Sequence, residues 1–98
     1  MVTIGADVHL KTTTFSVRNA EGERIVRQKV MNERDILLNF VRQFPDEKQF
    51  SMEAGYTWPL FYDLFKGEVD EFHLLHPKKL KAIIDSQSKN DANDWVRR

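Results

Sequence analysis

The sequence predicts one α/β domain over residues 1–98, with a mixed five-stranded sheet flanked by helices. Two observations support this. Three segments of strand character come first and are joined by short turns, which is typical of an antiparallel meander. Helical and strand segments then alternate, and that alternation requires parallel crossovers onto the same sheet. With 98 residues, 41% of them hydrophobic, the chain is large enough for a single small core.

The meander is predicted from residue alternation and turn chemistry. Residues 2–10 alternate apolar with polar side chains, and residues 12–18 are rich in β-branched and aromatic residues. The segment "NAEGE" at 19–23 has turn composition, and residues 24–30 form the third predicted strand. On the first strand, one face would hold Val2, Ile4, Ala6 and Val8.

The second half alternates helices with strands. Asn32 is a suitable cap for a helix over 33–44, where apolar residues recur at helical spacing until Pro45. The remaining predicted elements are a strand at 49–53, a helix at 58–65, a strand at 71–75, a helix at 78–85 and a helical segment at 90–98. Gly67 is a suitable stop after the helix at 58–65. This order is the one expected of the ribonuclease H-like fold.

Charge and composition narrow the function only slightly. Fifteen basic and fifteen acidic residues cancel, but residues 77–98 hold six bases against three acids, which suits contact with phosphate. The chain has no cysteine, which excludes disulfides and thiolate metal sites and fits a cytoplasmic protein. No apolar stretch approaches the roughly 20 residues of a membrane span, so we expect no membrane partner.

Two acids occupy positions that need a reason. Asp7 interrupts an apolar strand, where an unpaired carboxylate costs several kcal/mol, so it pairs with a group such as Lys11 or binds a cation. Glu53 closes a strand beside Gly55, and ligands of α/β sheets gather at the carboxyl ends of strands. Taken singly, either acid is also compatible with an ordinary structural role.

A second pair of acids lies near the end of the sequence. If residues 90–98 are helical, Asp91 and Asp94 share one face, with Cβ atoms about 5–6 Å apart. Helix capping by Ser88 or Asn90 would explain Asp91 through the helix dipole, but it does not explain Asp94.

Four carboxylates brought together would repel one another unless a cation lay between them. Mg²⁺ and Mn²⁺ prefer oxygen ligands, and a pair of such ions about 3.5–4 Å apart can promote chemistry at a phosphodiester. The four acids therefore predict a site for Mg²⁺ or Mn²⁺.

Four blocks of the sequence resemble one family in the family's own order. They are "IGADVHLKTTTFSV", "MEAGYTWPLFYDLF", "VDEFHLLHPKKLKA" and "KNDANDWVRR". Together they are similar to the DEDD transposases of insertion sequences, which are related to the Piv DNA invertase and carry a RuvC-like amino-terminal domain. By motif position, the resemblance implies that Asp7, Glu53, Asp91 and Asp94 are catalytic metal ligands.

The resemblance also implies an activity and partners. It implies metal-dependent cleavage and joining of DNA strands during transposition, a guide RNA for the full-length protein, and a homo-oligomer. Three departures concern loop details: a shortened "MEAGYTW" block, Asn90 and Trp95 in "NDANDW", and His76 in "LLHPKK". Family members continue into a further domain, so we expect these 98 residues alone not to complete the reaction.

Several other residues are candidates for secondary roles. Tyr56 is a candidate for stacking on a nucleobase, whereas core packing is the better prediction for Trp58. His9 either orients a metal-bound water or is structural, and His73 with His76 makes a weak case for zinc. Candidate phosphate contacts, for which a solvated surface is an equal explanation, are Lys78, Lys79, Lys89, Arg97 and Arg98.

Two other functions remain compatible with the sequence. One is an actin-like or sugar-kinase-type ATPase, although "DVHLKT" has His9 and Leu10 where such proteins need small residues beside phosphates. The other is a non-catalytic domain that binds nucleic acid or dimerises. Nucleotide binding would favour the first, and indifference to metal would favour the second.

Overall fold

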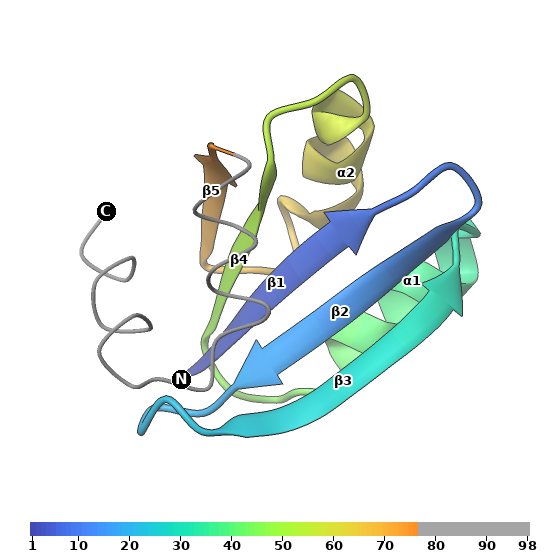
Figure 1. Ribbon diagram of the computed structural model, residues 1–98. Coiled ribbons are helices and arrows are strands. Elements are labelled where there is room, and N and C mark those ends of the chain that lie inside the picture. The colour runs from blue at the N-terminus through green and yellow to red at the C-terminus, as the bar shows by residue number, and fades with distance from the viewer. Residues whose placement is uncertain (77–98) are drawn as a thin grey trace.

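The computed structural model describes residues 1–76, and the predicted segments at 78–85 and 90–98 lie outside that part of the chain. The described residues form a mixed α/β fold of five strands and two helices (Figure 1). The elements are β1 (Val2–Val8), β2 (Thr12–Arg18), β3 (Arg24–Met31), α1 (Arg34–Arg42), β4 (Lys48–Glu53), α2 (Trp58–Phe65) and β5 (Glu71–Leu75).

The sheet has the strand order β3-β2-β1-β4-β5. The pairs β1–β2 and β2–β3 are antiparallel, which confirms the predicted meander. The pairs β1–β4 and β4–β5 are parallel, with α1 and α2 in the connections that precede β4 and β5. The carboxyl ends of β1 and β4 therefore lie at the same edge of the sheet.

The β2–β3 connection has the turn chemistry that its sequence predicts. The side-chain oxygen of Asn19 accepts hydrogen bonds from the backbone N–H groups of Glu21 (3.0 Å) and Glu23 (2.9 Å). Gly22 has a φ of 84°, a conformation that residues with a Cβ rarely adopt. A local hydrogen-bonding side chain and one glycine thus fix this hairpin.

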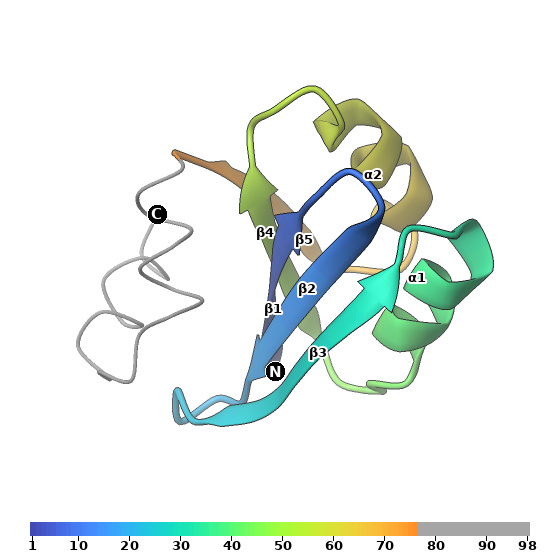
Figure 2. The same cartoon turned by 45° about the vertical axis from the view of Figure 1, so that its right-hand side comes forward.

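Both described helices pack on one face of the sheet (Figure 2). The ring of Phe40 from α1 stacks on Phe15 of β2 at 4.3 Å between centroids, and Phe65 from α2 lies 4.9 Å from Phe50 of β4. The opposite face of the central strands carries small and polar side chains instead, because Gly5 is paired with Ser16 on one side and with Ser51 on the other. Neither α1 nor α2 is long and apolar enough to cross a membrane.

Two predicted details of the fold are wrong. The strand predicted over 2–10 ends at Val8, because the chain turns at residues 9–11 into β2. Asn32 does not cap α1, which has Glu33 at its N-cap position and begins at Arg34. The helix predicted over 33–44 also ends earlier, at Arg42.

The side chain of Asn32 is engaged elsewhere. Its amide donates to the backbone oxygen of His9 (2.7 Å) and its oxygen accepts from the Thr13 hydroxyl (2.5 Å). Asn32 therefore fastens the β1–β2 loop to the end of β3.

Candidate metal centre

Asp7 lies next to the carboxyl end of β1. The apolar side chains of Ile4 and Ala6 point into the core, so Asp7 points to the opposite face of the sheet, together with Gly5. Its side chain is 46% exposed. The sequence predicted a carboxylate inside an apolar strand, and the structure corrects this: Asp7 is at the strand end and partly solvated, so burial alone does not require a cation.

Glu53 is the last residue of β4 and is exposed. The parallel pairing of β1 with β4 runs to Ala6 opposite Met52. The next residue on each strand is Asp7 on β1 and Glu53 on β4. Because facing residues of parallel strands point to the same side and neighbouring strands are about 4.8 Å apart, the two carboxylates are neighbours on one face.

His9 is the closest described partner of Asp7. Its Nε2 lies 3.2 Å from Oδ2 of Asp7, and its side chain is exposed. The Asn32 amide bond to the His9 backbone and the bond from the His9 N–H to the oxygen of Thr12 (2.8 Å) hold this residue in the hairpin loop. The predicted alternative partner of Asp7, Lys11, makes no ion pair with it among residues 1–76.

A small hollow lies beside Glu53. Its volume is about 140 Å³, and it is lined by Val8, Met52, Glu53, Gly55, Tyr56 and Thr57. The backbone of Gly55 borders open space, since a Cβ added there would meet no atom within 4 Å. The carboxylate of Glu53 is thus accessible from the side of the β4–α2 loop.

The described residues bring together two of the four predicted acids. Asp91 and Asp94 lie outside residues 1–76, as do the predicted phosphate contacts Lys78, Lys79, Lys89, Arg97 and Arg98. Within residues 1–76, no group of three or more histidine and acidic side chains could hold a metal ion. Asp7 and Glu53 can therefore supply part of a ligand set, and further ligands must come from elsewhere.

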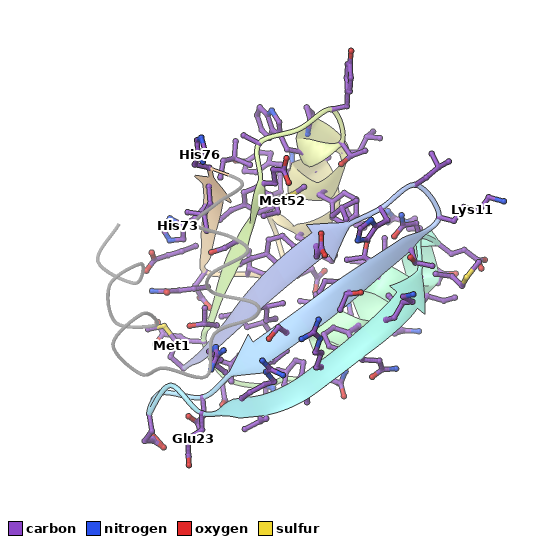
Figure 3. The ribbon with its side chains drawn as sticks, in the orientation of Figure 1. Met1, Lys11, Glu23, Met52, His73 and His76 are labelled. Atoms are coloured by element: carbon purple, nitrogen blue, oxygen red, sulfur yellow. The ribbon has the colours of Figure 1, made fainter. Side chains whose placement is uncertain are left out.

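The other candidate residues are placed as follows. Tyr56 is fully exposed on the β4–α2 loop, whereas Trp58 is partly buried and packs against the core, as predicted. His73 of β5 forms a hydrogen bond with its neighbour Glu71 (2.9 Å), and His76 is exposed beyond the strand (Figure 3).

Comparisons of this chain with protein-family models, with curated proteins and with solved structures give no match. The functional argument therefore depends on the chain's own residues and geometry.

Sequence reasoning missed the role of Asn32 in the loop that carries His9. Its position after a strand and before a helix is typical of a cap, and a cap was predicted. A second signal was present: the polar loop at 9–11 needs a donor for its backbone oxygens, and asparagine can supply one.

Proposed function

We propose that this chain is the amino-terminal catalytic domain of a DEDD transposase, with a ribonuclease H-like (RuvC-like) fold. The proposed activity is metal-dependent cleavage and joining of DNA strands during movement of an insertion element. The single observation that carries the proposal is the alignment of Asp7 with Glu53 on neighbouring parallel strands, on one face and at their carboxyl ends.

The strand order gives the fold assignment further support. An antiparallel meander β3-β2-β1, extended by the parallel strands β4 and β5, is the arrangement expected of a ribonuclease H-like sheet. In that arrangement the central strand β1 and its parallel neighbour β4 each bring one acid to the same edge. This is what the resemblance of the "IGADVHLKTTTFSV" and "MEAGYTWPLFYDLF" blocks implies.

The chemistry of the acid pair fits Mg²⁺ or Mn²⁺. Both side chains offer oxygen ligands, and Mg²⁺ in proteins keeps several waters while binding one or two carboxylates. A partly solvated pair at a strand end leaves room for such waters. In the proposal Asp7 and Glu53 hold the cation, Asp91 and Asp94 complete the set, and His9 orients the carboxylate of Asp7.

The bound ion supplies Lewis-acid assistance at a phosphodiester. The acids have a second role, because two carboxylates without a cation repel a phosphate group. The site would therefore accept the DNA backbone only when the metal is bound. The proposed partners are DNA, a guide RNA in the full-length protein and further copies of the chain, in the cytoplasm.

Thermal unfolding during a metal titration tests the proposal. A ligand that binds only the folded state stabilises it by about 2.7 kcal/mol at 100 times its Kd. In a domain of this size that is a rise in Tm of roughly 10 °C. We expect Mn²⁺ or Mg²⁺ to raise the Tm of the native chain and to have little effect on Asp7→Asn or Glu53→Gln.

Asp63→Asn is the matched control, because it removes an exposed carboxylate on α2 that belongs to no candidate site. It should respond to metal as the native chain does. A native chain whose Tm is indifferent to millimolar metal would contradict the proposal and favour a non-catalytic module. An equal response in the Asp7→Asn form would show that the cation binds elsewhere.

A further inference from the structure

Two apolar side chains are exposed beside the acid pair. Leu10, in the β1–β2 loop, is 92% exposed, and Tyr56, in the β4–α2 loop, is fully exposed. The first loop follows the strand that carries Asp7, and the second follows Glu53 (Figure 1). We call these segments, residues 9–11 and 54–57, the carboxyl-end loops.

Tyr56 has no packing role in the described structure. Within residues 1–76, the nearby aromatic rings of Trp58 and Tyr62 contact each other at 6.3 Å, but the ring of Tyr56 contacts none. Its loop is nevertheless ordered by backbone hydrogen bonds from Gly55 to Glu53 (2.9 Å) and from Trp58 to Gly55 (3.3 Å). Tyr56 also lines the hollow beside Glu53, so a flat group stacked on its ring would lie next to the acid pair.

The Leu10 loop is fastened as well. The side-chain amide of Asn32 donates to the backbone oxygen of His9, and the backbone N–H of Asn32 donates to that of Lys11 (2.9 Å). These bonds hold an apolar side chain outward at a loop tip, where it gains nothing from folding. The side chain of Lys11 extends away from the same hairpin (Figure 3) and is exposed.

We propose that the carboxyl-end loops bind DNA whose bases are unpaired at the acid pair. Tyr56 stacks on an unpaired base, Leu10 inserts as an apolar wedge at the edge of the paired region, and Lys11 contacts a phosphate. The inference rests on the proposed function and adds the strand state of its substrate.

An unpaired base fits the carboxyl-end loops better than a protein partner does. A hollow of about 140 Å³ has room for about five waters, which suits one flat group and not a protein segment. The other side chains around Tyr56 are polar or absent: Glu53, Gly55 and Thr57. A protein interface would need a larger contiguous apolar area at this place.

The test measures DNA binding by fluorescence anisotropy in EDTA, so that its result does not depend on metal. The probes are a single-stranded oligonucleotide, the same sequence fully paired, and a duplex with a short mismatched bubble. We expect the native chain to prefer the two forms with unpaired bases. Tyr56→Ala should raise the Kd for the single strand by about 5- to 150-fold, and the Kd for the paired duplex by less than twofold.

Three further variants separate the roles. Tyr56→Phe keeps the ring and should bind within twofold of the native chain. Leu10→Ala should weaken binding to the bubble more than to the single strand. Lys11→Gln should weaken binding to all three probes by similar factors and reduce the salt dependence by about one unit.

Leu60→Ala is the control, because it removes an exposed apolar side chain from α2 away from the hollow. All these side chains are exposed, so the variants should keep the native Tm. The inference is overturned if the native chain binds no DNA, if Tyr56→Ala affects single-stranded and paired DNA equally or not at all, or if Leu60→Ala has the same effect. A metal response that persists alongside such results would leave the proposed function standing.

Discussion

Asn32 is a single residue on which the geometry of the β1–β2 loop depends. Its oxygen accepts from the hydroxyl of Thr13, a residue with no exposed surface, and its amide satisfies the backbone oxygen of His9. Removing one partner of a buried hydrogen bond leaves the other unsatisfied, and that costs more than the bond itself contributes.

We therefore expect Asn32→Ala to lower the free energy of unfolding by about 1–3 kcal/mol, measured by urea denaturation. Asn39→Ala, at an exposed position of α1, should change it by less than about 0.5 kcal/mol. Thr13→Val in the Asn32→Ala background should recover part of the loss, since both polar partners are then gone. Equal effects of Asn32→Ala and Asn39→Ala would show that the loop contacts contribute nothing.

At the scale of elements, the sequence predicts the type of every described helix and strand and misplaces some ends. Residues 58–65 and 71–75 form the predicted helix and strand, because apolar spacing, Pro59 and Gly67 delimit them. Gly67 follows the helix without the left-handed φ typical of such a stop, since Gly22 alone has a positive φ within residues 1–76. The start of α1 was misplaced because Asn32 has two competing uses, and only the position of the β1–β2 loop decides between them.

The end of α1 is connected to the α2–β5 loop by one ion pair. Arg42 donates from Nε and Nη2 to the two carboxylate oxygens of Glu68, at 3.0 and 2.9 Å. These hydrogen bonds, together with the charge of Arg42, hold the pKa of Glu68 below its ordinary value. The pair therefore stabilises the fold when Glu68 is ionised.

The direction of the pH effect follows from that lowered pKa. A carboxylate whose pKa is lower in the folded state contributes stability above its unfolded pKa and loses it as pH falls through the folded pKa. We expect Glu68→Gln to be less stable than the native chain at pH 7 and to approach it below about pH 4, measured as the urea midpoint. Glu21→Gln, in the exposed β2–β3 turn, should show no such convergence. A constant difference between the native chain and Glu68→Gln across this range would contradict the assignment.

At the scale of the whole molecule, the candidate site depends on how the sheet is assembled. The sequence predicts that Asp7 and Glu53 end two strands, but alternation within each strand does not reveal which strands are neighbours or in what register. A slip of one residue between β1 and β4 would send Glu53 to the other face. The observed register, Ala6 opposite Met52, comes from core packing of residues distant in sequence.

Phe50 lies at the centre of that packing. It is fully buried on β4, and its ring contacts Phe15 of β2, Phe65 of α2 and Phe72 of β5 at centroid distances of 6.4, 4.9 and 5.2 Å. One side chain thus joins the meander, a crossover helix and the edge strand. Its loss affects every layer of the fold at once.

We expect Phe50→Ala to lower the free energy of unfolding by about 3–5 kcal/mol, because a large cavity replaces a buried ring. Domains of this size have a total stability of about 5–15 kcal/mol, so the variant should unfold at a Tm lower by more than about 10 °C, followed by circular dichroism. Phe44→Ala is the matched control: that ring is only partly buried beyond α1 and contacts Phe40 at 5.6 Å. Its cost should be clearly smaller, and a cost equal to that of Phe50→Ala would mean that β4 is not the strand on which the assembly of the sheet, and hence the alignment of Asp7 with Glu53, depends.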